Sequence, residues 1–403
     1  MKKLEHKVPN LRFKDFTDDW EQRKLGELGS VQMNKRIFKN QTSESGDVPF
    51  YKIGTFGKKA DAYISNSLYQ DYKEKYPYPN KGDLLISASG SIGRIVEYKG
   101  QKAYYQDSNI VWLEHNNHVL NSFLKAFYQI VKWDGTEGST IKRLYNKNIL
   151  NTKIKLPKVK EQKVLGTLIS TVDLLISLQQ QKLDLLKQLK KGLLQKMFAD
   201  KDSKRPVLRF KGFHDDWEQR KLGEISDIKS GLSTNTQSKK NLYKITRIET
   251  ISDGFIDVKK VGTVREKPDK KFLMNCGDIL FSNINSLKHI GKVAIFDGSF
   301  TLYHGMNLLR ITVNTKTSSY FIYYELSTKK YRNWAKAHAN PAVSQASINQ
   351  SELSLENMSL TSLAEQEKIV NLLLLLDKLI SLQQQKLAKY QSIKKSLLQQ
   401  MFI

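Results

Sequence analysis

Two long stretches of the chain carry apolar side chains at intervals of seven residues and contain no proline. They cover residues 160–198 and 364–402, and the second series of apolar positions lies 204 residues after the first. A seven-residue repeat of apolar positions is typical of helices that pack along a coiled-coil seam. We therefore predict two long helices of roughly 58 Å each, at about 1.5 Å per residue.

Two matched helices in one chain are expected to pack on each other in antiparallel fashion, although each could instead pack on its own domain. Polar residues interrupt the apolar seam at the same heptad positions in both copies: Gln179 and Gln383, and likewise Lys190 and Lys394. A polar residue in such a seam can fix the register of the helix pair. Gln179 and Gln383 are therefore predicted to set this register.

A second repeat precedes each of the two helices. Residues 9–28 read PNLRFKDFTDDWEQRKLGEL and residues 206–225 read PVLRFKGFHDDWEQRKLGEI, with sixteen of twenty positions identical at an offset of 197. The chain is therefore predicted to be an internal tandem repeat with pseudo-two-fold symmetry. Trp20 and Trp217 are expected to pack in the core, with the neighbouring charges on a helix or turn that starts each domain. The predicted segments are a first domain at 1–156, a spacer helix at 157–201, a second domain at 202–359 and a second spacer helix at 360–403.

The two interiors are predicted to be mixed α+β domains with short strands, which places the chain in the α/β class. Asp83–Ser87 and Asp278–Ser282 are strand-like, and each follows a Gly-Asp turn. Glycine-bearing loops come next in both copies. Residues 121–133 and 319–337 are expected to be helical.

Charge is the strongest compositional signal. The 403 residues include 66 Lys and Arg against 40 Asp and Glu, a formal net charge of +26, and residues 1–156 and 202–359 each carry +9. Two equally basic domains favour two footprints on one polyanion, with nucleic acid as the first candidate. One cysteine excludes an intramolecular disulfide. With no apolar stretch of membrane-spanning length and no secretory signal, a cytoplasmic protein without a membrane partner is expected.

The sequence contains no catalytic signature, so no catalytic and no metal-binding residues are predicted. The chain lacks a Walker A loop, a dinucleotide-binding GxGxxG and the Asn/Asp-Pro-Pro-aromatic turn of adenine methyltransferases, for which Asn340-Pro341 is the nearest string. His115 and His118 have the spacing of metal ligands but no evident partners. These features favour a binding module over an enzyme.

Polar and basic loop residues are the candidates for contact with DNA, because base edges are read by Arg, Lys, Asn, Gln and Ser side chains. They fall in three regions of each domain, at similar places relative to the repeats. For any single residue, a solvated loop is the alternative interpretation. The candidates are Lys35, Arg36, Ser89, Ser91, Arg94, Lys142, Arg143, Asn146 and Lys147 in the first domain, and Ser233, Thr234, Asn235, Asn283, Asn285, Lys288, Lys292, Ser344, Gln345 and Asn349 in the second.

The layout resembles the specificity subunit of type I restriction–modification systems. The resemblance rests on the duplicated WEQRKLGE, the GDLLIS-type strand and the EQ…ISLQQQKL…LLQKMF helix, and it covers essentially the whole chain. It implies two target recognition domains that read the halves of a split, asymmetric DNA sequence. It also implies helices that space the domains and dock two methyltransferase (modification) subunits.

The same resemblance implies that chemistry resides on partner subunits. No cofactor is expected on this chain, whereas S-adenosylmethionine, ATP and Mg are expected on the methyltransferase and restriction subunits. One alternative is a DNA methyltransferase or nuclease with an unrecognised active site. Another is a coiled-coil interaction protein whose basic charge suits a membrane or RNA.

Overall fold

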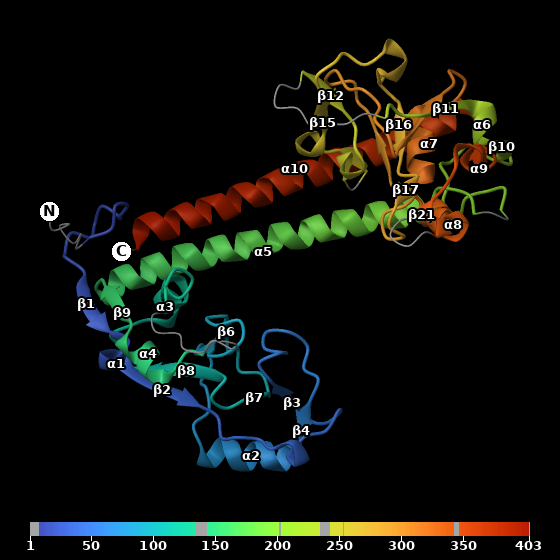
Figure 1. Ribbon diagram of the computed structural model, residues 1–403. Coiled ribbons are helices and arrows are strands. Elements are labelled where there is room, and N and C mark those ends of the chain that lie inside the picture. The colour runs from blue at the N-terminus through green and yellow to red at the C-terminus, as the bar shows by residue number, and fades with distance from the viewer. Residues whose placement is uncertain are drawn as a thin grey trace. The chain divides into compact units, whose positions relative to one another are not determined.

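The computed structural model describes residues 8–133, 143–200, 203–233, 242–252, 254–341 and 346–402 (Figure 1). The chain forms two compact units. Unit 1 consists of Met1–Gln180 and Gln385–Ile403, and unit 2 consists of Gln181–Gln384. Each unit therefore combines one α/β interior with a segment from each of two long helices.

The two long helices are α5 (Val159–Lys196) and α10 (Leu363–Met401), which confirms the helices predicted from the heptad repeat. In unit 1, Leu165 and Ile169 of α5 share a core with Leu398 and Met401 of α10. Leu165 and Ile169 lie near the start of α5 and meet the end of α10, whereas Asp173, further along α5, pairs with the earlier Lys394, so the two segments run antiparallel.

The lysines that interrupt the heptad seam are held by aspartates of the facing helix. Lys394 lies 2.5 Å from Asp173 in unit 1, and Lys190 lies 2.5 Å from Asp377 in unit 2. The repeat offset of 204 relates Asp173 to Asp377 and Lys190 to Lys394. The same Asp–Lys pair is therefore used once in each unit.

Each interior is built on an antiparallel sheet of four strands, with the same strand order in both units. The predicted strands at 83–87 and 278–282 occupy inner positions, which explains their apolar runs. In unit 1 the order is β2 (Gly29–Met33), β8 (Ile110–His115), β5 (Leu84–Ser87) and β6 (Ile95–Glu97). In unit 2 it is β11 (Ser226–Ser230), β19 (Leu309–Val313), β16 (Ile279–Phe281) and β18 (Val293–Ile295).

Short elements surround the sheets. The strands of unit 1 are β1 (Glu21–Lys24), β3 (Val48–Tyr51), β4 (Tyr63–Ile64), β7 (Tyr104–Tyr105) and β9 (Lys153–Leu156), and its helices are α1 (Leu25–Leu28), η1 (Lys39–Gln41), α2 (Asn66–Lys75), α3 (Asn121–Phe127) and α4 (Asn146–Asn151). The strands of unit 2 are β10 (Glu218–Lys221), β12 (Tyr243–Ile245), β13 (Ile251–Ser252), β14 (Phe255–Ile256), β15 (Gly262–Val264), β17 (Ile284–Asn285), β20 (Asn340–Pro341), β21 (Ala346–Ser347) and β22 (Asn357–Leu360). Its helices are α6 (Leu222–Ile225), η2 (Ile248–Thr250), η3 (Val258–Lys260), η4 (Lys270–Phe272), α7 (Ser319–Leu326), α8 (Lys329–His338) and α9 (Gln350–Ser354).

Three local predictions differ from the structure. The EQRK string of each opener is a strand, because its backbone pairs with β9 or β22 before the short helix begins. The helix predicted at 121–133 ends at Phe127. The helix predicted at 319–337 is split into α7 and α8 because Thr328 adopts an extended conformation and its hydroxyl donates to Glu325 O.

Trp20 and Trp217 are buried in equivalent aromatic clusters, as predicted. Trp20 packs edge-on against Phe123 and Phe402, and Trp217 packs against Phe198 and Phe321. In each unit the opener therefore docks on the carboxyl end of one long helix, α10 in unit 1 and α5 in unit 2.

A buried ion pair ties each opener to the amino end of the other long helix. Arg12 donates to both oxygens of Glu161 at 2.7 and 2.8 Å, and Arg209 donates to both oxygens of Glu365 at 2.7 and 2.9 Å. The glutamate side chains are 2% and 0% exposed. These bidentate contacts fix the opener between two helix ends.

Candidate nucleic-acid interface

In unit 1, the three predicted loop regions meet at one short segment, Gln106–Asn109. Arg36 donates to Asp107 Oδ2 at 3.0 Å, and Arg143 donates to Ser108 Oγ at 3.0 Å. Ser89 donates to Asn109 Oδ1 at 2.9 Å and forms a β-bridge with Arg143. Candidates from three distant parts of the sequence thus meet at one segment, where Arg36 is exposed, Arg143 is half-buried and Ser89 is buried.

This connecting segment was missed by the sequence analysis. Ser108 adopts a left-handed backbone conformation, with φ of 51°, which is uncommon for a residue other than glycine. Its side chain holds the Arg143 guanidinium, which also lies 5.9 Å from the Tyr145 ring. The polar string Gln-Asp-Ser-Asn before a buried strand was the available signal.

The remaining candidates of unit 1 lie around this cluster. Lys35 is exposed, with its ammonium 4.8 Å from the centre of the Tyr76 ring. Arg94 is exposed and donates to Phe56 O at 3.0 Å, which ties the glycine-bearing loop to the loop at 52–58. Ser91, Asn146 and Lys147 are exposed. Lys142 lies outside the described residues.

Unit 2 repeats the loop pairing of unit 1. Leu144 N donates to Ala88 O at 2.8 Å in unit 1, and Ile348 N donates to Asn283 O at 2.8 Å in unit 2. Both bonds join the loop after the inner strand to the segment before the last short helix. Equivalent backbone positions therefore carry different side chains in the two units.

The candidates of unit 2 occupy that pairing and its surroundings. Asn283 donates to Ile348 O, and Asn285 donates to Ser282 Oγ. Asn349 caps α9 by accepting from Glu352 N at 2.7 Å. Ser233 and Lys288 are exposed, and Lys292 is half-buried. Thr234, Asn235, Ser344 and Gln345 lie outside the described residues.

A basic hollow of 590 Å³ extends this surface in unit 2. Asn285 and Lys292 line it together with Arg247, Lys259 and Lys260, which the sequence analysis did not select. Partial burial, followed by the charges of Lys292, Lys288 and Arg332, lowers the pKa of His289, which also lines the hollow. Such a concentration of cations suits the phosphates of a nucleic acid backbone.

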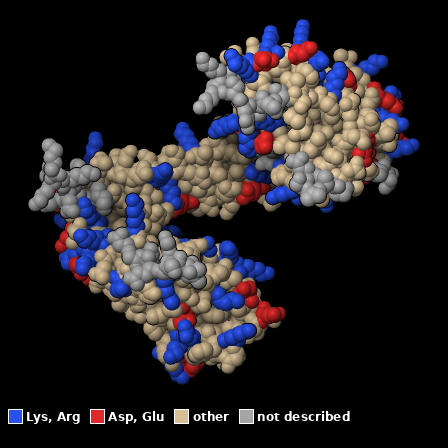
Figure 2. Space-filling model, in the orientation of Figure 1, with Lys and Arg blue, Asp and Glu red and all other residues tan. Residues whose placement is uncertain are grey.

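Basic side chains are spread over both units, with smaller groups of acidic side chains between them (Figure 2). Within the described ranges, no three His, Cys, Asp or Glu side chains come together to hold a metal ion, and no helix is long and apolar enough to cross a membrane. The His115 ring nitrogens lie 2.9 Å from Asn116 O and 2.7 Å from Asn121 Oδ1. This histidine is therefore part of a local hydrogen-bond network.

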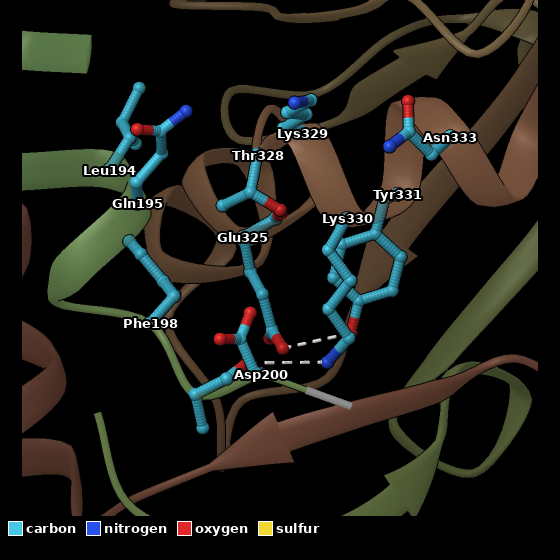
Figure 3. A pocket seen from close by; sticks show the side chains of 11 residues that line it. Leu194, Gln195, Phe198, Asp200, Glu325, Thr328, Lys329, Lys330, Tyr331 and Asn333 are labelled. Carbon is cyan, nitrogen blue, oxygen red and sulfur yellow. Dashed lines mark hydrogen bonds between the residues drawn. The ribbon is translucent and has the colours of Figure 1, made fainter. Parts of the chain in front are cut away.

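A second hollow in unit 2, of 350 Å³, contains a buried carboxyl group. Figure 3 shows Glu325 pointing toward Tyr331 and Lys330, with Asp200 beside it. Glu325 accepts from Tyr331 Oη and from Ser359 N, both at 2.9 Å. Burial raises the pKa of Glu325 to about 7, although the bond from Ser359 N and the charge of Lys330 oppose the shift.

Replacing this carboxyl with an amide is expected to remove a pH dependence of stability. The folded state holds the Glu325 proton more tightly than the unfolded state, so its contribution is full at low pH and falls as pH rises toward about 7. Between pH 4 and pH 8, the unfolding free energy of Glu325→Gln should gain about 3 kcal/mol relative to wild type. Urea denaturation at both pH values measures this gain. The exposed Glu266→Gln variant serves as the control and should show no comparable change.

Comparison with known proteins gives a consistent family match. The family model of the type I restriction modification DNA specificity domain matches residues 17–188 and 214–391, once in each half of the chain. A solved S subunit of the type I restriction–modification system of M. genitalium aligns over 98% of this chain and 99% of its own, with a TM-score of 0.65 and 15% identity. A chain from a structure of type I complex assembly and conformational transition aligns over 95% of this chain and 97% of its own, with a TM-score of 0.55 and 16% identity. These alignments support the fold.

Curated relatives match parts of the chain. A Haemophilus influenzae protein named as a type I restriction enzyme specificity subunit is 62% identical over 139 residues, 34% of this chain and 36% of the relative. A Methanocaldococcus jannaschii protein named as the MjaX specificity subunit is 41% identical over 194 residues, 47% of this chain and 46% of the relative. The chain thus spans less than half the length of either relative.

Proposed function

Because the chain belongs to the family of type I restriction modification DNA specificity domains, we propose that it recognises an asymmetric, bipartite DNA target for such a complex. Residues 1–156 and 202–359 would be the target recognition domains, each reading one half of the target. The chain itself is proposed to be non-catalytic. S-adenosylmethionine, ATP and Mg belong to its methyltransferase and restriction partners in this proposal.

The observation that carries this proposal is the gathering of the predicted loops. Arg36, Ser89 and Arg143 meet at residues 106–109, and the bond from Leu144 N to Ala88 O recurs in unit 2 with other side chains around it. Similar backbones with similar net charge attract phosphates equally. Different side chains on them would read different bases.

Docking of two methyltransferase subunits is the second part of the proposal, and exposed leucines on the long helices support it. Leu178 is 48% exposed and Leu382 is 51% exposed, at equivalent positions of α5 and α10. Leu174, Leu185 and Leu189 are also exposed on α5. Apolar side chains left uncovered on a helix are typical of a surface that another helix covers.

A footprint on randomised DNA tests the bipartite target. The chain should protect two short sequences separated by a tolerant gap. A spacer of roughly 58 Å allows at most about 17 base pairs between the domain centres, and about 10 base pairs would place both halves on one face of the duplex. A single contiguous site would overturn the proposal. Methylation of DNA by the purified chain with labelled S-adenosylmethionine would instead favour the methyltransferase alternative.

The arginine at the centre of the loop cluster is expected to contribute to base recognition. Arg143→Ala should cost roughly 1–3 kcal/mol of binding free energy and relax specificity at one base position, if its guanidinium contacts a guanine edge. Arg94→Ala tests the neighbouring loop in the same way. If either residue contacts only phosphate, affinity should fall on all sequences and the salt slope by about one. The exposed Arg205→Ala variant is the charge-matched control. Wild-type binding by Arg143→Ala would place that residue outside the interface.

Gln179 and Gln383 are expected to lower the stability of the helix pair while fixing its register. Gln383 is buried at 7% exposure and Gln179 is half-buried. Replacing both with Leu should raise the melting temperature because apolar seam residues pack better, while loosening the preferred gap in the target. Calorimetry and binding to targets with varied gaps measure the two effects. An unchanged gap preference would contradict a role in register.

A further inference from the structure

Unit 1 contains two turns with the same sequence pattern and the same backbone. Residues 36–41 read RIFKNQ and residues 143–148 read RLYNKN, so each turn has an arginine, an aliphatic residue, an aromatic residue, two polar residues and an amide. The aromatic residues have nearly the same conformation, with φ of −90° and ψ of 159° at Phe38, and φ of −84° and ψ of 155° at Tyr145. Both turns lie in one unit, so the tandem repeat does not relate them.

A hydrogen bond to a side-chain amide closes each turn. Phe38 N donates to Gln41 Oε1 at 2.8 Å, and Gln41 N donates to Phe38 O at 2.9 Å. Tyr145 N donates to Asn148 Oδ1 at 3.1 Å, and Asn148 N donates to Tyr145 O at 2.9 Å. In the first turn, Gln41 Nε2 also donates to Tyr72 Oη at 3.4 Å. The backbone that carries each ring is therefore held in one conformation.

Local helix stability does not explain the two rings. Phe38 is the N-cap of η1 and Tyr145 is the N-cap of α4, and neither side chain accepts a hydrogen bond from the first turn of its helix. Short polar side chains stabilise this position better. In unit 2, the corresponding turn has Asn349 at this place, and its side chain caps α9. An aromatic residue at both N-caps of unit 1 therefore indicates another role.

Each ring is exposed, whereas the aliphatic residue before it is packed. Phe38 is 57% exposed and Tyr145 is 42% exposed. Leu144 is buried in the main core of unit 1, and Ile37 is partly buried against a smaller cluster. The aliphatic residues anchor the turns while the rings face solvent. Rings that are already fixed lose little conformational entropy when a partner covers them.

The two arginines bring the turns to one place. Arg36 donates to Asp107 and Arg143 donates to the next residue, Ser108. The Cα atoms of consecutive residues are about 3.8 Å apart. The Arg36 side chain is 61% exposed and that of Asp107 only 17%, so the guanidinium remains accessible despite the ion pair. Each exposed ring thus follows, by two residues, an arginine that is tied to the same short segment.

An exposed ring beside cations suits the bases of a nucleic acid. Lys39 directly follows Phe38 and is exposed, as is Lys147 beyond Tyr145. In such an arrangement the ring stacks on the face of a base while the cations contact the phosphates around it. A side chain reaches a base face in duplex DNA where two neighbouring base pairs are partly unstacked. The basic surroundings favour DNA over an apolar protein partner.

We infer that Phe38 and Tyr145 each stack on a base at a partly unstacked step of the half-site that unit 1 reads. This inference rests on the proposed function and adds residues that read the deformability of DNA. Pyrimidine–purine steps unstack most easily, so they should be favoured where the rings insert. Unit 2 has Asn349 in place of the second ring, so the two units would read their half-sites by different means.

A fluorescent base analogue tests the inference. The full chain first selects its target from randomised DNA, and 2-aminopurine then replaces each base of the half-site of unit 1 in turn. The fluorescence of 2-aminopurine rises when the base loses its stacked neighbours. The chain is used without its methyltransferase subunit, so that only its own contacts unstack the DNA. The variants are Phe38→Ala, Tyr145→Ala, the double variant and Phe38→Trp, and Phe13→Ala removes an exposed ring of the opener as the matched control.

Wild type, Phe13→Ala and Phe38→Trp should raise the fluorescence at the same positions. Each single Ala variant should abolish the rise at one position and weaken target binding about fivefold or more. The salt dependence of binding should stay unchanged because no charge is removed. Far-UV circular dichroism at wild-type values excludes misfolding. Wild-type fluorescence changes and affinity in the double variant, or no rise with wild type bound to its target, would overturn the inference. Failure of wild type to select any sequence would instead overturn the proposed function.

Discussion

Exchange of residues 29–155 for the interior of a related chain is expected to change one half of the recognised DNA sequence and leave the other half unchanged. The opener before these residues and the helix after them would be retained. Unit 2 would keep its own loops, its basic hollow and its sheet. Because each interior has its own four-stranded sheet and core, its loops can be replaced without altering those of the other unit.

The structure shows which contacts the incoming interior must keep. Phe123 and Leu124 of α3 share the core of unit 1 with Leu165, Ile169 and Phe402, all of which are retained by the exchange. The incoming helix must therefore present large apolar side chains at these two positions.

A close approach between α3 and α5 sets a second requirement. A Cβ atom added at Gly166 would lie 2.5 Å from Ser122 Oγ, so a bulky residue at position 122 would separate the two helices. Exchanges that respect both requirements should fold as stably as wild type.

Selection of binding sites from randomised DNA measures the outcome. We expect a new sequence in one half-site, an unchanged sequence in the other, and an unchanged number of bound methyltransferase subunits. The corresponding exchange in unit 2, at residues 226–359, tests the second half of the target in the same way. A change in both halves after either exchange would refute independent recognition by the two domains.

Removal of the Arg209 guanidinium is expected to be strongly destabilising. Arg209→Ala would leave the Glu365 carboxylate, which is 0% exposed, without its bidentate partner. Loss of one member of a buried pair costs about 3–5 kcal/mol, because the remaining charge stays desolvated. In the described residues, the Glu365 carboxylate would then keep the hydrogen bond from Thr361 Oγ1.

Urea denaturation monitored by tryptophan fluorescence measures this loss. Trp217 lies in unit 2 with Arg209, so its fluorescence should report the earlier unfolding of that unit. Trp20 lies in unit 1. Arg12→Ala should have the corresponding effect through Glu161 in unit 1. Combining Arg209→Met with Glu365→Leu removes both charges and should recover most of the stability. A loss below about 1 kcal/mol for Arg209→Ala, the range of an exposed pair, would contradict a structural role for the buried pair.

The sequence by itself determined the repeat and the long helices. Helical periodicity and internal identity are local properties, so α5, α10 and the docking of both tryptophans could be predicted from the residues alone. The strands at 84–87 and 279–281 were predictable because inner strands are continuously apolar. The lysines in the seam were visible as interruptions, but their partners Asp173 and Asp377 were identified only by the structure.

The tertiary structure alone decided which loop residues come together. Arg36, Ser89 and Arg143 are far apart in the sequence and meet only because residues 106–109 return between them. It also decided that the EQRK strings are strands, since their conformation depends on pairing with β9 and β22, at least 129 residues away. Contacts between distant segments depend on how the sheet orders its strands, and the residues of one segment carry little information about that order.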